Sequence, residues 1–117
     1  MGIKKRNSSN QINEMLLEER CVLNKVLKLT GKRWLAEILL LVENGVSRFS
    51  LLKINMDGIS DNVLAHSLKT LLSAGLVTKT VYQQIPIKVE YQLSSSGKKL
   101  LILLHGLCGW GKENIEV

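Results

Sequence analysis

The sequence predicts a mainly helical α+β fold that carries one small β-hairpin. Apolar residues recur at helical spacing through most of the chain, and alternation of β-branched residues is confined to residues 76–93. Glycines stand mostly at the ends of these segments. The chain has 117 residues, 45% of them hydrophobic, which is enough for one modest core. We therefore expect a single domain over residues 11–117, preceded by a flexible basic arm in residues 1–10.

Two helices are expected in the first part of the chain. Apolar residues recur at helical spacing from Gln11 to Leu29, and Gly31 is expected to end this helix in a left-handed cap. A second helix is expected from about Lys32 to Asn44. Its core face would carry Trp34, Leu35, Ile38, Leu41 and Val42.

The middle of the chain predicts two helices joined by a tight turn. A short strand over residues 47–49 and a short helix over residues 50–54 precede a turn at residues 56–58. Ser60 is a suitable N-cap for a longer helix over residues 61–74. The positions of that helix that face the core would be Leu64, Leu68, Leu71 and Leu72.

Two alternating runs follow, at residues 76–82 and 88–93, joined by a connection that contains Pro86. They predict a β-hairpin, and a last helix is expected over residues 95–112. Two short helices separated by a Gly-containing turn and followed at once by a two-stranded wing are typical of a winged helix-turn-helix domain. The first and last helices are then expected to serve dimerisation.

Apolar residues occupy five consecutive positions of the last helix, from Leu100 to Leu104. They point all round the helix, and a domain of this size covers only one face. We therefore expect a homodimer, with the helix at residues 11–29 contributing, and we expect Cys108 to be a small buried apolar residue. The expected interface residues are Leu100, Leu103, Leu104, Leu107 and Trp110.

The helix over residues 61–74 has a polar stripe opposite its leucine row. With the turn and the wing beside it, this stripe predicts entry into the major groove of double-stranded DNA, where Asn62 could read adenine and Asp61 cytosine. Arg48 and Lys88 are the preferred phosphate ligands. The alternative is an ordinary solvated helix face. The candidate DNA-binding residues are Arg48, Ser60, Asp61, Asn62, Ala65, His66, Lys69, Lys79 and Lys88.

The chain resembles the HxlR family of prokaryotic winged-helix regulators from Cys21 to Glu113. The resemblance rests on Cys21, Thr30-Gly31-Lys32-Arg33-Trp34, Arg48-Phe49-Ser50-Leu51-Leu52, Gly58-Ile59-Ser60, the leucines up to Gly75-Leu76-Val77, Val81-Tyr82, Pro86, Lys88-Val89-Glu90-Tyr91-Gln92-Leu93, Gly97 and Leu107-Cys108-Gly109-Trp110-Gly111. It implies a homodimer on a palindromic operator. Two departures stand out, because Val22 replaces the Pro that usually follows the cysteine and the wing loop lacks the usual basic stretch.

The resemblance also places a redox-sensing thiol at Cys21. If a helix began just after Cys21, its N-terminus, together with Arg20 and Lys25, would stabilise a thiolate, whereas Glu18 and Glu19 would oppose it. If Cys21 instead lies inside a continuous helix, the helix dipole contributes nothing. A structural cysteine is therefore the alternative to a sensor.

Composition narrows the function classes. The net charge of +6 is consistent with a polyanionic partner, although Lys4, Lys5 and Arg6 supply half of it. Two cysteines without zinc spacing and two histidines without a carboxylate at suggestive spacing indicate no metal, no cofactor and no enzyme. We expect a cytoplasmic protein with no membrane partner. A winged-helix protein-interaction module remains the alternative to a DNA-binding regulator, and an effector, whether a small molecule or an oxidant, is left open.

Overall fold

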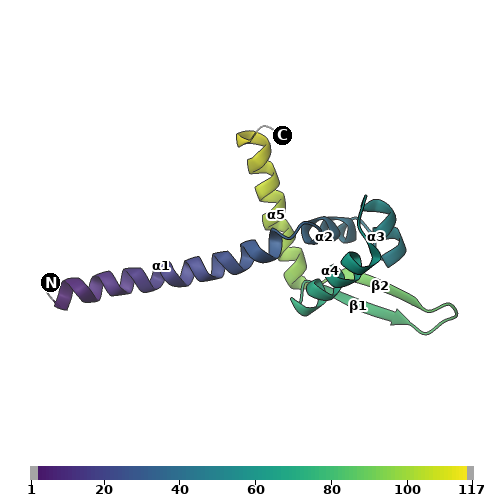
Figure 1. Ribbon diagram of the computed structural model, residues 1–117, viewed down its shortest axis with the longest axis horizontal. Coiled ribbons are helices and arrows are strands. Elements are labelled where there is room, and N and C mark those ends of the chain that lie inside the picture. Colours follow the sequence, from purple (N-terminus) through teal and green to yellow (C-terminus); the bar gives the residue numbers. More distant parts are fainter. Residues whose placement is uncertain (1–2, 116–117) are drawn as a thin grey trace. The chain divides into compact units, whose positions relative to one another are not determined.

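The computed structural model describes residues 3–115, which form five helices and one two-stranded antiparallel sheet (Figure 1). The chain divides into two compact units, Met1–Lys32 and Arg33–Val117. None of the helices in the described part of the chain is long and apolar enough to cross a membrane.

The first unit contains a single helix, α1 (Ile3–Thr30). It begins earlier than the expected start at Gln11, so the backbone of residues 3–10 is helical, and residues 1–2 lie outside the described residues. The left-handed cap expected at Gly31 is wrong, because positive φ angles occur only at other glycines of the described chain. A Cβ at Gly31 would instead lie 2.6 Å from the carbonyl oxygen of Leu27, and this close approach is what favours glycine there.

Apart from the short strand expected at residues 47–49, the second unit follows the predicted order of elements, with shifts of a few residues at their ends. Its helix α2 begins at Leu35, three residues later than expected, because Trp34 occupies the N-cap. Gly75 ends the longest middle helix with a φ of +73°, as a left-handed C-terminal residue should. The elements are α2 (Leu35–Glu43), α3 (Phe49–Asn55), α4 (Asp61–Ser73), β1 (Val77–Tyr82), β2 (Lys88–Leu93) and α5 (Ser95–Asn114).

The short strand expected at residues 47–49 is wrong. Arg48 is extended but caps α3, and Phe49 already belongs to that helix. The segment keeps one strand-like contact, because the backbone N–H of Tyr91 donates to the carbonyl oxygen of Ser47 at 2.7 Å. One hydrogen bond is too little for a ladder, yet it fastens the segment before α3 to β2.

The predicted hairpin is present, and its register runs from the pair Val77–Leu93 at its root to the pair Tyr82–Lys88 beside the loop. Leu76 and Val77 are buried, whereas every later residue of β1 is exposed. The root of the hairpin therefore belongs to the core, and its loop at residues 83–87 extends beyond the helices (Figure 1).

A leucine row on α4 forms the centre of the core. Leu64, Leu68 and Leu71 are 0–2% exposed, as predicted, and α4 packs against α2, α3 and β1. The core also contains Ile38 and Leu39 of α2, Leu52 of α3, Met56, and Leu101 of α5.

The predicted core face of α2 needs a correction. Leu35, Ile38 and Val42 are buried, but Leu39 is buried in place of Leu41, which is only half-buried. Trp34 is also half-buried, because it precedes the helix, and its ring lies 4.5 Å from the guanidinium of Arg33.

Helix α5 packs closely on the hairpin at Gly97 but not at Gly106, so alanine substitutions at these two positions should change stability in opposite directions. A Cβ at Gly97 would overlap the carbonyl oxygen of Leu76 and lie 3.4 Å from Leu93 Cδ2. Gly97→Ala should therefore lower the free energy of unfolding by about 1–3 kcal/mol. The matched control is Gly106→Ala, where a Cβ meets nothing within 4 Å, and it should raise that free energy by about 0.5–1 kcal/mol. Urea unfolding checks both, and equal effects of the two variants would contradict the packing described.

Candidate nucleic-acid interface

The predicted polar stripe lies on the exposed face of α4. Ser60 starts the helix, because its side-chain oxygen accepts a hydrogen bond from the N–H of Val63 at 3.1 Å. The buried leucine row fixes the rotation of the helix about its axis, so the opposite side chains face outward. The exposed members of the stripe are Asp61, Asn62, Ala65, His66 and Lys69.

Asp61 has a partner that sequence analysis did not identify. Its Oδ1 lies 2.7 Å from the Nζ of Lys53 in the last turn of α3. The carboxylate is at the N-terminus of α4 and the ammonium at the C-terminus of α3, which is the favourable arrangement for both helix dipoles. Exposed pairs of this kind contribute about 0–1 kcal/mol to stability. The pair nevertheless holds Asp61 toward α3, and this positioning competes with base contact.

Lys88 of the wing is paired with Glu90. The Nζ of Lys88 lies 2.9 Å from Glu90 Oε1 and 5.0 Å from the ring of Tyr82. The hydrogen bond from Lys88 is the main cause that lowers the pKa of Glu90 below its usual value, with smaller contributions from Ser47 and Arg48, while burial opposes the change. The structure therefore gives Lys88 an anionic neighbour, and Arg48 acts on the same carboxylate only through its charge.

Lys79 lies on the other face of the hairpin. Side chains alternate along a strand, and opposed residues share a face. Lys79 pairs with Tyr91, whereas Tyr82 pairs with Lys88, an odd number of residues further along β1. The structure therefore does not place Lys79 and Lys88 on one surface of the wing.

The expected dimer residues are largely uncovered in the single chain. Leu103, Leu107 and Trp110 are 57–66% exposed, and Leu100 and Leu104 are half-buried. Cys108 is also exposed in the single chain, where Leu101 and Gly97 are the buried residues of α5, so its expected burial at a dimer interface stays a prediction. Ile102, at 70% exposure, belongs to the same apolar surface and was not identified from the sequence. Helix α1 also carries exposed apolar residues along its length, namely Ile12, Met15, Leu16, Leu17, Val22, Leu23, Val26 and Leu27.

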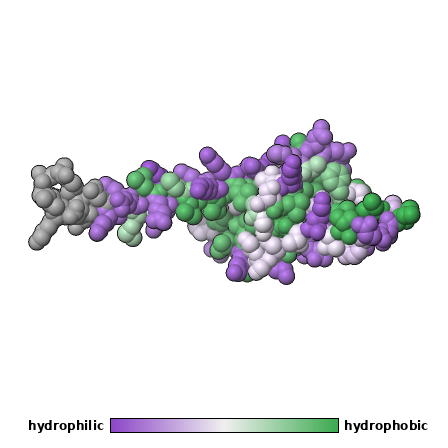
Figure 2. Space-filling view, turned by 90° about the horizontal axis from the view of Figure 1, so that it is seen from below, coloured by the Kyte–Doolittle hydropathy of each residue, from purple (hydrophilic) through white to green (hydrophobic). Residues whose placement is uncertain are grey.

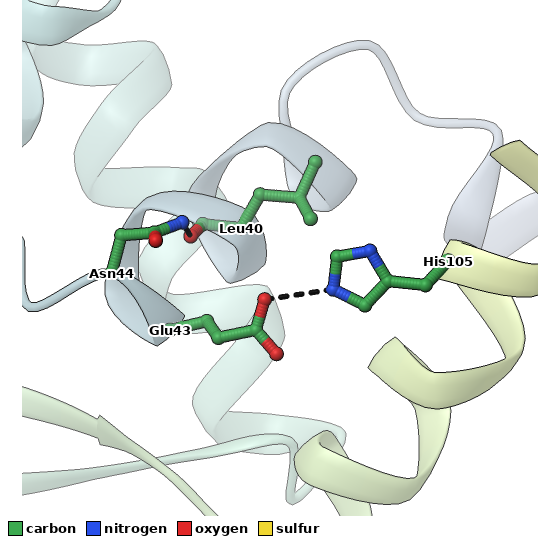
Figure 3. A network of polar contacts seen from close by, with 4 residues as sticks. All are labelled: Leu40, Glu43, Asn44 and His105. Atoms are coloured by element: carbon green, nitrogen blue, oxygen red, sulfur yellow. Dashed lines mark hydrogen bonds and ion pairs between the residues drawn. The ribbon is translucent and has the colours of Figure 1, made fainter.

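One histidine does have a carboxylate partner. Figure 3 shows His105 of α5 with its Nε2 2.8 Å from Oε1 of Glu43, at the end of α2. The residues are 62 positions apart, so no sequence spacing could indicate the contact. Beside it, the side chain of Asn44 donates to the carbonyl oxygen of Leu40 at 2.8 Å and closes the last turn of α2. The described residues contain no cluster of three potential metal ligands.

Cys21 lies in the interior of α1 and is exposed. A helix start just after Cys21 is therefore wrong, and the alternative of a continuous helix is confirmed. The helix dipole gives this thiol no assistance, because its effect is limited to the first turn.

Comparison with known proteins identifies the family of this chain. A family model described as HxlR-like helix-turn-helix matches residues 29–117. The HTH-type transcriptional regulator YtcD of Bacillus subtilis (strain 168) is 38% identical over 90 residues, which cover 77% of this chain and 71% of YtcD. YtfH of Escherichia coli (strain K12), another HTH-type transcriptional regulator, is 33% identical over 108 residues, or 92% of this chain and 86% of YtfH.

Solved structures show the same fold. The reduced form of the transcriptional regulator YodB from B. subtilis superposes with a TM-score of 0.74 and 29% identity, covering 80% of this chain and 91% of YodB. The redox regulator HypR in its oxidized form gives a TM-score of 0.73 at 29% identity, over 83% of this chain and all of HypR (100%).

The environment of Glu90 predicts a pH dependence of stability. Its pKa in the folded chain is below the unfolded value of 4.5. Its contribution is therefore fully present above about pH 4.5 and is lost as the pH falls through the lowered folded pKa. The free energy of unfolding lost in Glu90→Gln should be larger at pH 7 than at pH 3. Urea unfolding of both proteins across this range measures the difference, and a loss that is independent of pH would contradict the assignment.

Proposed function

The chain belongs to the HxlR-like helix-turn-helix family of transcriptional regulators, and on this premise we propose that it acts as a homodimer on a palindromic DNA operator. The observation that carries the proposal is the division of α4 into a buried leucine row and an exposed polar stripe. An α-helix of this kind fits the major groove, which is about 12 Å wide.

Within the stripe, we assign separate roles to the side chains. Asn62 is the best candidate for direct base reading, because a carboxamide can pair with adenine through two hydrogen bonds. His66 and Lys69 follow on the same exposed face, one and two turns further along α4. Asp61 retains its predicted role at cytosine only if it leaves Lys53, so we assign it chiefly to positioning α4.

Phosphate contacts are assigned to residues on either side of α4. Arg48, before α3, and Lys88, which leaves Glu90 when it does so, can each bind a phosphate of the DNA backbone. Lys79 lies on the other face of the wing and would need a different segment of the backbone.

The exposed apolar residues of α5 support the dimer. A monomer rarely leaves such a contiguous surface in water, and a two-fold partner would cover it. Two α4 helices related by that symmetry would reach successive major grooves, so half-site centres should lie about 10 base pairs, or a small multiple, apart.

A protein-interaction module without DNA readout is the competing function for this fold. The positive charges of Arg48, Lys69 and Lys88, which stand before α3, on α4 and on the wing, favour DNA, because they suit a polyanionic partner.

A response to thiol oxidation is a second proposal. Two observations support it: Cys21 is exposed on α1, and two of the structural relatives are described by their redox state. Oxidation of a thiol in a helix with an exposed apolar face would alter whatever that face packs against.

Two substitutions should distinguish phosphate contacts, which position the protein on DNA, from base contacts, which read the sequence. Lys88→Ala should weaken binding to all sequences and reduce the salt slope by about one unit. Asn62→Ala should instead reduce discrimination at one base position by about 1–3 kcal/mol. Mobility shifts on selected and randomised duplexes at several salt concentrations measure both, with Lys98→Ala on α5 as the control. Equal losses on every sequence for both variants would contradict the assigned roles.

The dimer should be detectable at micromolar concentration. Sedimentation should give about twice the 13.1 kDa chain mass. Leu103→Glu should dissociate the dimer, because it places a charge on the exposed apolar surface of α5, whereas the control Ser96→Glu adds the same charge to an exposed polar position. A wild-type protein that sediments as a monomer would overturn the dimer and the palindrome with it.

Thiol control is tested in a Cys108→Ser background. Diamide should join the Cys21 thiols of two protomers in a disulfide, itself taking up the two electrons and two protons, and so release the protein from DNA. Reducing agent should restore both thiols and binding. The further change Cys21→Ser should abolish this response while leaving reduced binding intact. Diamide treatment that modifies Cys21 without changing DNA affinity would leave the cysteine with a structural role.

A further inference from the structure

The loop at the end of the wing is apolar and uncovered. Ile85 is 102% exposed and Ile87 67% exposed, and residues 83–87 contain no charged side chain. Figure 2 shows hydrophobic side chains gathered at this free end of the hairpin. Val81 and Tyr82, at 45% and 39% exposure, continue the apolar character down the end of β1.

These side chains do not pack against the core of the chain. The hairpin contributes to the core only through its root, where Val77 is 3% exposed, while the loop is at the opposite end of both strands. A turn of this length needs no isoleucine, because polar residues and glycine are the usual loop formers. Exposed apolar residues gathered at one projecting tip indicate a surface that they enter.

The lysines near the tip indicate what kind of partner surface the loop contacts. Lys88, which is paired with Glu90, directly follows the loop, and Lys79 lies further down β1 on the other face, so the two lysines flank the hairpin on opposite sides. A partner with anionic groups outside and apolar groups within would satisfy both the lysines and the isoleucines. Duplex DNA has this arrangement, with phosphates at the edge of the minor groove and stacked bases inside it.

We propose that Ile85, supported by Pro86 and Ile87, wedges into the minor groove next to the α4 site, partly unstacks a base step and bends the duplex. This inference rests on the proposed DNA-binding function. Isoleucine and proline are among the side chains that proteins insert between base steps, and such wedges kink DNA by about 20–90°. Steps of pyrimidine followed by purine unstack most readily, so the wedge would select TA or CA/TG at a position that α4 does not touch.

Two measurements on the full-length protein test the wedge. Duplexes that carry 2-aminopurine at successive positions outside the α4 half-sites report unstacking by increased fluorescence, and gel mobility of circularly permuted fragments reports bending. Wild-type protein should bend the site by at least about 20° and brighten one base step beside each half-site. Ile85→Gln should remove the fluorescence change and most of the bend, and Ile85→Leu should restore both.

The control Ile115→Gln changes another exposed isoleucine, at the end of α5, and should behave as wild type. If wild-type protein binds its site without unstacking, or if Ile85→Gln unstacks it equally, the wedge is overturned and the proposed function stands. If no sequence-specific complex forms at all, the proposed function fails together with the wedge. If Ile85→Gln changes the sedimenting mass but not the fluorescence, the tip contacts a second copy of the chain and the wedge is overturned.

Discussion

The structure of the second unit depends on the leucine row of α4. Leu64, Leu68 and Leu71 are almost fully buried, and burial of each such side chain contributes about 1.5–3 kcal/mol. Rotation of α4 about its axis would expose this row, so its orientation is fixed. The polar stripe is therefore presented outward by the core itself, and the ion pair between Lys53 and Asp61 only refines the position of the first turn.

The remaining elements extend this core in two directions. On the wing side, the Ser47–Tyr91 hydrogen bond and the group around Glu90 tie β2 to the segment before α3, so the wing is coupled to the helix-turn-helix. On the other side, α5 enters the core through Gly97 and Leu101 alone, and His105 reaches Glu43 of α2. Leu100 and Leu104 of α5 are half-buried, and its remaining large apolar residues are exposed in the single chain.

Elements marked by local chemistry were predictable from the sequence. Ser60 as a cap, the positive φ at Gly75 and the alternation in the hairpin depend on neighbouring residues, and each is found in the structure. Features set by long-range contacts were missed or wrong. Residues 47–49 have a strand-like composition but only one backbone bond to β2, and His105 meets a carboxylate 62 positions away. The sequence predicted that the site residues share one face of α4. It did not predict the ion pair of Asp61 with Lys53, because that contact depends on how α3 packs against α4.

The central claim is that the outward stripe of α4 enters the major groove, and methylation interference tests it most directly. A duplex that the protein binds is first selected from random sequences. This duplex is treated with dimethyl sulfate, which methylates guanine at N7 in the major groove and adenine at N3 in the minor groove, and the protein is added afterwards. If α4 enters the major groove, N7 methylation should prevent binding in two clusters about one helical turn, roughly 10 base pairs, apart. A complex that tolerates N7 methylation throughout its site would contradict this claim.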